Sequence, residues 1–236
     1  MITTTIASPG SLLTAALSRR PTRPEIAIAL GFPAALFFAV SLGWLVRTGG
    51  IVRITDARMA TTIAVELALA LLIVPYLKTQ GWRPQDIAGS PTPFDVVRGA
   101  GVIFAAYLSI WFVALILHFA APDVLATIRS HPITGTVSPL TVLVVAIINP
   151  VFEEFLWLGY AIPALGARYG LRIAIAGSIA LRLAVHTYQG ALALVTILPT
   201  AIVFTWYFVR TGRLWPVIVA HMIADALALS LLRPPS

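Results

Sequence analysis

Residues 137–165 read VSPLTVLVVAIINPVFEEFLWLGYAIPAL. This apolar stretch is longer than the roughly 20 residues that a helix needs to cross a hydrocarbon layer of about 30 Å. It carries Pro150 and, three residues after it, the two acidic residues Glu153 and Glu154. Because a proline removes an intrahelical hydrogen bond, we expect either one kinked crossing or two shorter segments here.

The whole chain shares this apolar character. Of its 236 residues, 59% are hydrophobic and 11% are charged, whereas soluble globular proteins carry about 25% charged residues. So few charges cannot cover a water-facing surface, and the composition excludes disorder, a coiled coil and a polar-faced solenoid. The absence of cysteine excludes a disulfide framework, a thiolate metal site and a cysteine nucleophile. The composition indicates a membrane protein.

Six more apolar windows of membrane-crossing length accompany this stretch. They cover residues 26–46, 59–77, 99–121, 171–188, 190–209 and 214–232. The predicted fold class is therefore all-α, a polytopic transmembrane helical bundle with seven crossings, or eight if 137–165 forms two. Residues 1–25, rich in Ser, Thr and Pro, are predicted to form an N-terminal tail, and residues 26–236 a single transmembrane domain.

The basic residues favour one orientation in the membrane. With seven crossings, the loops on the side of the N-terminus hold ten Lys and Arg residues and the opposite loops hold five. Loops rich in positive charge face the cytoplasm, so the N-terminal tail is predicted to be cytoplasmic in a multi-pass protein of the bacterial inner membrane. The ten are Arg19, Arg20, Arg23, Lys78, Arg83, Arg98, Arg168, Arg172, Arg210 and Arg213, and the five are Arg47, Arg53, Arg58, Arg129 and Arg233.

The net charge of +7 comes almost entirely from these arginines. They lie between apolar runs rather than in one patch, so we expect them to contact anionic lipid headgroups. The sequence contains no glycine-rich phosphate loop, RNA-binding signature or zinc finger. Membrane lipid is therefore the predicted partner and nucleic acid is not, while the oligomeric state has no signature in the sequence.

Six ionisable residues fall inside three of the apolar windows. Each costs at least about 2.5–3.5 kcal/mol at membrane depth, and such residues usually face a bundle interior or a water-filled cavity. Two pairs within the set are four residues apart and therefore share a helical face. We expect all six to gather around one buried polar site: Glu153, Glu154, Arg182, His186, His221 and Asp225.

A seventh ionisable residue, Glu66, lies in the window 59–77 without an obvious partner. The sequence leaves three roles open for it. It could contact Arg182, accept a hydrogen bond from a backbone donor, or take part in catalysis.

Three segments resemble the motifs of a known family. Residues 153–159, EEFLWLG, are similar to the glutamate-pair motif of the CPBP family, which comprises the CAAX prenyl proteases and bacteriocin-processing or Abi proteins. Residues 182–190, RLAVHTYQG, resemble its second motif, in which a histidine ends a helix. Residues 220–225, AHMIAD, resemble its third, His-x-x-x-Asn/Asp. The resemblance covers about residues 137–232, the predicted catalytic core.

The resemblance implies an intramembrane endopeptidase that hydrolyses a peptide bond in a membrane-anchored peptide or protein. It implies that Glu153 and His186 activate the attacking water and that Glu154 supports the site. It further implies that His221 and Asp225 position or polarise the scissile carbonyl and its oxyanion. No cofactor is expected, because the chain has no His-Glu-x-x-His pair. Zinc remains the alternative, with Glu153, His186, His221 and Asp225 as its ligands.

Two positions depart from the family pattern. Leu158 stands where the family has an arginine five residues after the first glutamate, and Arg182 stands where an aromatic residue is common. One hypothesis is that the positive charge has moved to Arg182, which then pairs with Glu154 and supports the site. The alternative is a catalytically degenerate member that acts as a membrane scaffold or bacteriocin-immunity protein.

A transporter that carries protons on its intramembrane acids is a third possibility. Transporters usually show internal repeats with paired broken helices. Here the ionisable residues crowd into the second half of the chain, which disfavours this interpretation.

Overall fold

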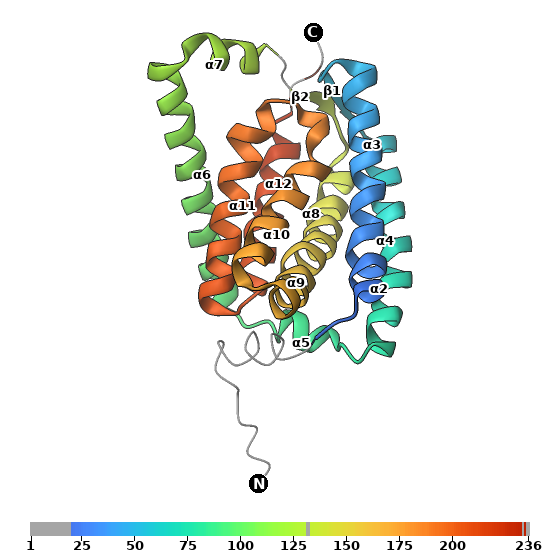
Figure 1. Ribbon diagram of the computed structural model, residues 1–236. Coiled ribbons are helices and arrows are strands. Elements are labelled where there is room, and N and C mark those ends of the chain that lie inside the picture. The colour runs from blue at the N-terminus through green and yellow to red at the C-terminus, as the bar shows by residue number, and fades with distance from the viewer. Residues whose placement is uncertain (1–19, 131–132, 233, 235–236) are drawn as a thin grey trace.

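The structure is a computed structural model that describes residues 20–130, 133–232 and 234. It is an all-α membrane helical bundle, as predicted, with its helices running along a common axis (Figure 1). Within the described residues, five helical stretches are long and apolar enough to cross a membrane: Arg23–Thr48, Asp56–Thr79, Phe94–Ala120, Pro139–Tyr169 and Leu192–Thr211. The protein is therefore a multi-pass membrane protein.

The first half of the chain forms the outer parts of the bundle. Its elements are α2 (Arg23–Ile26), the π-turn η1 (Ala27–Gly31), α3 (Phe32–Thr48), β1 (Val52–Thr55), α4 (Asp56–Thr79), α5 (Pro84–Ala88), α6 (Phe94–Ala120) and α7 (Pro122–Arg129). The first helical stretch begins at Arg23, three residues before the predicted start of the first crossing. Most of the predicted tail, residues 1–19, lies outside the described residues.

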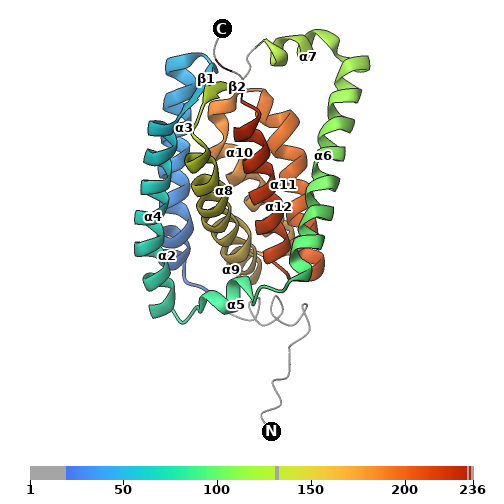
Figure 2. The same ribbon diagram turned by 180° about the vertical axis from the view of Figure 1, so that it is seen from behind.

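The second half supplies most of the interior. Its elements are β2 (Ile133–Thr136), α8 (Pro139–Glu154), the π-turn η2 (Phe155–Tyr160), α9 (Ala161–Tyr169), α10 (Leu171–Val185), the 3-10 turn η3 (Thr187–Gln189), α11 (Leu192–Thr211) and α12 (Trp215–Ser230). Figure 1 shows α10, α11 and α12 between α3 on one side and α6 on the other. In the view from behind, α8 lies between α4 and α12 (Figure 2).

The apolar stretch 137–165, which contains the two glutamates, forms one helical crossing and not two. Pro150 lies within α8, which continues past it to Glu154. The irregularity comes directly after the glutamates, where η2 widens the helix into a π-turn before α9. Such single π-turns inside α-helices occur frequently at functional sites.

The described residues thus contain seven helical stretches along the bundle axis. Two of them are short, since α10 has 15 residues and α12 has 16. At 1.5 Å per residue they extend only about 22–24 Å, less than the hydrocarbon thickness. α10 packs against α3, α9 and α11, and α12 packs against α6 and α8.

A two-stranded parallel sheet, which the sequence analysis did not predict, joins the starts of α4 and α8. Val52 of β1 pairs with Ile133 of β2, at the end of the bundle opposite α5 (Figure 1). Directly after β2, the hydroxyl of Ser138 caps α8, and its backbone N–H donates to Asp56 Oδ1 at 2.8 Å. These contacts fix α4 and α8 side by side, which brings their buried carboxylates together.

The opposite half of the bundle is held by a buried carboxylate on α2. Glu25 Oε1 accepts a hydrogen bond from Trp82 Nε1 at 2.7 Å and another from the hydroxyl of Tyr160 at 3.1 Å. Because Tyr160 ends the π-turn η2, these bonds tie the first crossing to the segment that follows the glutamate pair.

Candidate active site

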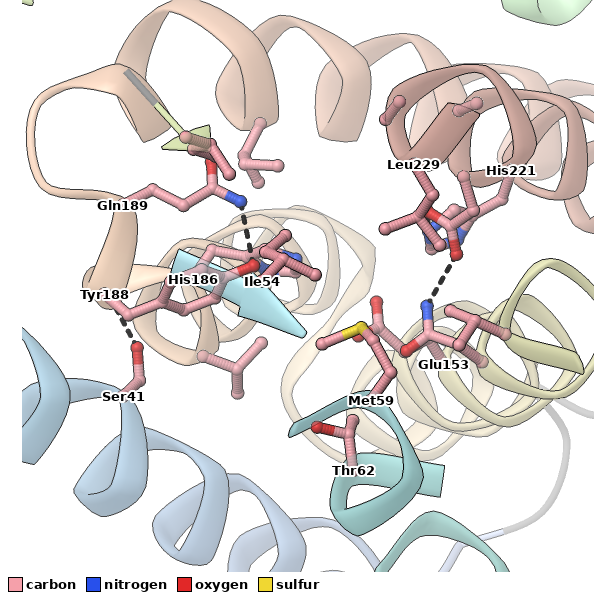
Figure 3. Close-up of a pocket in the computed structure, with 18 of the residues that line it drawn as sticks. Ser41, Ile54, Met59, Thr62, Glu153, His186, Tyr188, Gln189, His221 and Leu229 are labelled. Atoms are coloured by element: carbon pink, nitrogen blue, oxygen red, sulfur yellow. Dashed lines mark hydrogen bonds and ion pairs between the residues drawn. The ribbon is translucent and has the colours of Figure 1, made fainter. Parts of the chain in front are cut away.

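A cavity of about 1000 Å³ occupies the half of the bundle nearer to β1 and β2. Its wall is formed by residues of α3, α4, α6, α8, α10, α11 and α12. Five of the six predicted site residues line it: Glu153, Arg182, His186, His221 and Asp225. Figure 3 shows Glu153, His186 and His221 arranged around this space. The predicted convergence of three distant segments on one pocket is therefore present.

The sixth residue, Glu154, lies behind the cavity wall and is fully buried. Arg182 donates from Nη1 to Glu154 Oε1 and from Nη2 to Oε2, each at 2.7 Å. This two-pronged geometry is the strong form of an arginine–carboxylate pair. His221 Nδ1 lies 2.7 Å from the same Oε1, so Glu154 joins α8, α10 and α12. The predicted pairing of Arg182 with Glu154 is present.

A second polar chain continues from His221 along α12. The other ring nitrogen of His221, Nε2, lies 3.4 Å from Asp225 Oδ1, as expected for residues one helical turn apart. Asp225 Oδ2 accepts a hydrogen bond from Asn149 Nδ2 at 3.0 Å. The sequence analysis did not select Asn149. Its position four residues before Glu153, on the same face of α8, was the signal that could have identified it.

His186 ends α10, as the second motif implies. Its Nδ1 lies 2.8 Å from the carbonyl oxygen of Arg182. A carbonyl can only accept, so Nδ1 carries the hydrogen, and in the neutral imidazole Nε2 is left as the acceptor. The backbone of α10 therefore fixes the tautomer that a general base needs.

Two carboxylates in this region lack hydrogen-bond partners within the described part of the chain. They are Glu153 and Glu66, and in each the buried Oε2 atom is unsatisfied. Glu66 lies on α4, is 1% exposed and lines the cavity. No hydrogen bond or ion pair joins Glu66 to Arg182 among the described residues, and Arg182 donates to Glu154 instead.

The zinc alternative names Glu153, His186, His221 and Asp225 as ligands. Across residues 20–130, 133–232 and 234, no group of three or more His, Cys, Asp or Glu side chains could hold a metal ion. We therefore derive no step through a metal.

Comparison with curated proteins and with solved structures found no match. Comparison with protein families found one, described as "Type II CAAX prenyl endopeptidase Rce1-like", over residues 135–227. This segment runs from β2 into α12 and contains all six residues of the predicted site. The match covers the part of the chain that carries the three motifs, and it supports the resemblance of this segment to the CPBP family of CAAX proteases.

Proposed function

We propose that this protein is an intramembrane endopeptidase that cleaves a peptide bond in a membrane-anchored substrate. One observation carries the proposal: a carboxylate without a partner, Glu153, and a histidine with an open Nε2, His186, line the same cavity inside the bundle. The family supports hydrolysis of a peptide bond as the reaction class.

In the proposed reaction, Glu153 and His186 hold a water molecule and accept its proton as its oxygen attacks the carbonyl carbon of the scissile bond. The carbon–nitrogen bond of the tetrahedral intermediate then breaks, and the proton is passed to the leaving amine. The products are a carboxylate and an amine. General-base groups of this kind typically contribute about 10²–10⁴-fold to the rate.

The polar chain on the other wall is proposed to stabilise the oxyanion. The 3.4 Å contact to Asp225 is long for a hydrogen bond, so the Nε2–H of His221 remains available to the substrate carbonyl oxygen. Asp225, held by Asn149, and Glu154, held by Arg182, fix the orientation of this ring. Donors fixed in advance around developing charge are usually the largest single contribution to such catalysis.

The positive charges of the loops indicate from which side of the membrane the substrate approaches. In Figure 1 the first helix begins at the end of the bundle that carries α5, opposite β1 and β2. The cavity lies nearer to the two strands, because Ile54 and Ile133 are among the residues that line it. If the N-terminus is cytoplasmic in a bacterial inner membrane, as the excess of positive loops favours, the cavity lies in the outer half of the membrane. The proposed substrate is then a membrane-anchored peptide approached from that side.

The test is cleavage of a quenched fluorescent peptide library by the protein purified in detergent. We expect Glu153→Gln and His186→Ala each to lower cleavage by about two to four orders of magnitude. Asp123→Asn is the control, because it removes an exposed carboxylate of α7 far along the chain from the site. Cleavage that persists at the original rate in both site variants would refute the assignment.

The same assay separates the enzyme from the scaffold or bacteriocin-immunity alternative. That alternative rested on the missing arginine at position 158, and the ion pair of Arg182 with Glu154 supplies a positive charge from another helix. A folded, purified protein that cleaves no member of the library would favour the scaffold.

A further inference from the structure

We infer that Glu66 forms a subsite for a basic side chain of the substrate, a lysine or arginine close to the scissile bond. The inference rests on the proposed endopeptidase function and names the chemistry of its substrate. Glu66 lies on α4, outside residues 135–227, so the family match does not include it.

Glu66 is a buried acid with an unused hydrogen-bonding position. Its side chain is 1% exposed and lines the cavity, and Oε2 has no hydrogen-bond partner among the described residues. A carboxylate removed from water without a donor costs several kcal/mol. Such a group is expected where a ligand supplies the missing donor.

The cationic groups of the cavity wall are already engaged elsewhere. Arg182 is held by Glu154, and His221 lies between Glu154 and Asp225. Arg58 is eight residues before Glu66 on α4, which is about 12 Å along the helix at 1.5 Å per residue. Its guanidinium group stacks on Trp44, with 4.3 Å between the guanidinium carbon and the ring centroid. No described cation therefore pairs with Glu66.

Glu153, the acid of the proposed mechanism, also has an oxygen without a hydrogen-bond donor within the described part of the chain. Oε2 of Glu153, on the neighbouring α8, is also buried without a partner among the described residues. The region therefore holds two acidic side chains that each have a buried oxygen without a donor among the described residues. A guest that carries an ammonium or guanidinium group would supply both positive charge and donors.

The surrounding wall suits the rest of such a side chain. Ile63, one turn before Glu66 on α4, and Phe152, next to Glu153 on α8, both line the cavity. A lysine or arginine can bury its methylene stem against apolar surface while its charged end reaches a polar partner. Sites built to hydrogen-bond a substrate group discriminate strongly against analogues that lack it.

The experiment compares peptides that differ only by lysine or norleucine at each position flanking the cleaved bond. We expect the wild-type protein to prefer lysine at one position by about tenfold or more in kcat/KM. Glu66→Gln, which keeps the shape and removes the charge, is expected to reduce that ratio by about tenfold. Asp123→Asn should keep the ratio. An equal loss on both peptides, an unchanged ratio in Glu66→Gln, or a wild-type protein without preference would overturn the inference.

A binding measurement separates failure of this inference from failure of the proposed function. His186→Ala leaves both acids in place, so fluorescent peptides can be titrated onto it whether or not the wild-type protein cleaves them. The lysine peptide should bind more tightly than the norleucine peptide, and Glu66→Gln in the same background should remove the difference. Butylammonium should compete with the lysine peptide on the wild-type protein, and butanol should not. Equal binding of the two peptides, or equal competition, overturns the subsite even if cleavage is observed.

Discussion

Arg182 on α10 and Glu154 on α8 form a buried two-pronged ion pair, with both nitrogen–oxygen contacts at 2.7 Å. The two side chains are 3% and 0% exposed, so neither charge has water to compensate it. At the family's arginine position this chain has Leu158, which is fully buried among apolar residues. The positive charge beside the glutamate pair is thus provided by a different helix.

Replacing Arg182 by leucine should therefore be strongly destabilising. The variant leaves the buried carboxylate of Glu154 without its main partner, and breaking a buried pair in this way typically costs about 3–5 kcal/mol. We expect a large decrease in the thermal unfolding temperature in detergent, together with loss of peptide cleavage.

Arg182→Lys is the matched control for this change. It keeps the positive charge but loses the planar fork, so we expect a smaller decrease than for leucine. If Arg182→Leu unfolds at the original temperature and cleaves normally, the idea that the charge moved from position 158 to position 182 is wrong.

Asn149 is expected to act as a positioning residue through Asp225. Asn149→Ala removes the 3.0 Å hydrogen bond to Asp225 Oδ2 and leaves that carboxylate free to turn away from His221. Because the proposed oxyanion donor is then less well oriented, kcat should fall by about tenfold while KM changes little. Steady-state kinetics on one peptide provide the measurement.

Asn149→Asp tests the same contact by replacing the hydrogen bond to Asp225 with a repulsive interaction. It places a second carboxylate against Asp225, and like charges at this distance repel. We expect a larger loss of kcat than for alanine. A rise in KM at constant kcat, in either variant, would instead assign Asn149 to substrate binding.

The sequence predicts the crossings well because their signal is local. A window such as 99–121 is apolar over the full thickness of a bilayer, and the structure has α6 at Phe94–Ala120. The convergence of the site was predictable because a charge at membrane depth is too costly to face lipid, and because four-residue spacings place His221 and Asp225 on one face.

Other features depend on contacts that no local pattern encodes. The strands β1 and β2 have four residues each, too few for an alternating pattern to be recognised, and they pair over a long sequence separation. The π-turn η2 has no characteristic residue type. Glu66 could be recognised as unusual, but its position on the cavity wall follows only from the packing of α4 against α8.

Ser178 should stabilise the π-turn without contributing to catalysis. Its hydroxyl, fully buried on α10, donates to the carbonyl oxygen of Trp157 at 2.6 Å. Ser178→Ala leaves that carbonyl with one bond fewer between two fully buried residues, which typically costs about 1–3 kcal/mol. We expect a lower unfolding temperature and an unchanged kcat at a temperature where the variant is folded. A decrease in kcat there would show that the π-turn geometry itself controls the position of the glutamates.

The close approach of α6 to α12 at Gly99 gives a sharper structural test, because a second glycine provides the control. A Cβ atom at Gly99 would lie 2.6 Å from Val219 Cγ1 and 2.9 Å from the carbonyl oxygen of Pro216, whereas one at Gly101 would have no neighbour within 4 Å. Gly99→Ala must therefore push α12 away from α6, and overpacking of this kind costs about 1–3 kcal/mol.

Since α12 carries His221 and Asp225, Gly99→Ala should lower both the unfolding temperature and peptide cleavage. Gly101→Ala lies on the same helix and only replaces glycine by a better helix former, so its stability should be equal or slightly higher. Val219→Ala, combined with Gly99→Ala, removes the contact with Cγ1 but leaves those with Val219 Cβ at 2.7 Å and with the carbonyl oxygen of Pro216, so it should restore only a small part of the loss. If the two single glycine variants unfold at the same temperature, the packing of α6 on α12 is looser than this contact implies.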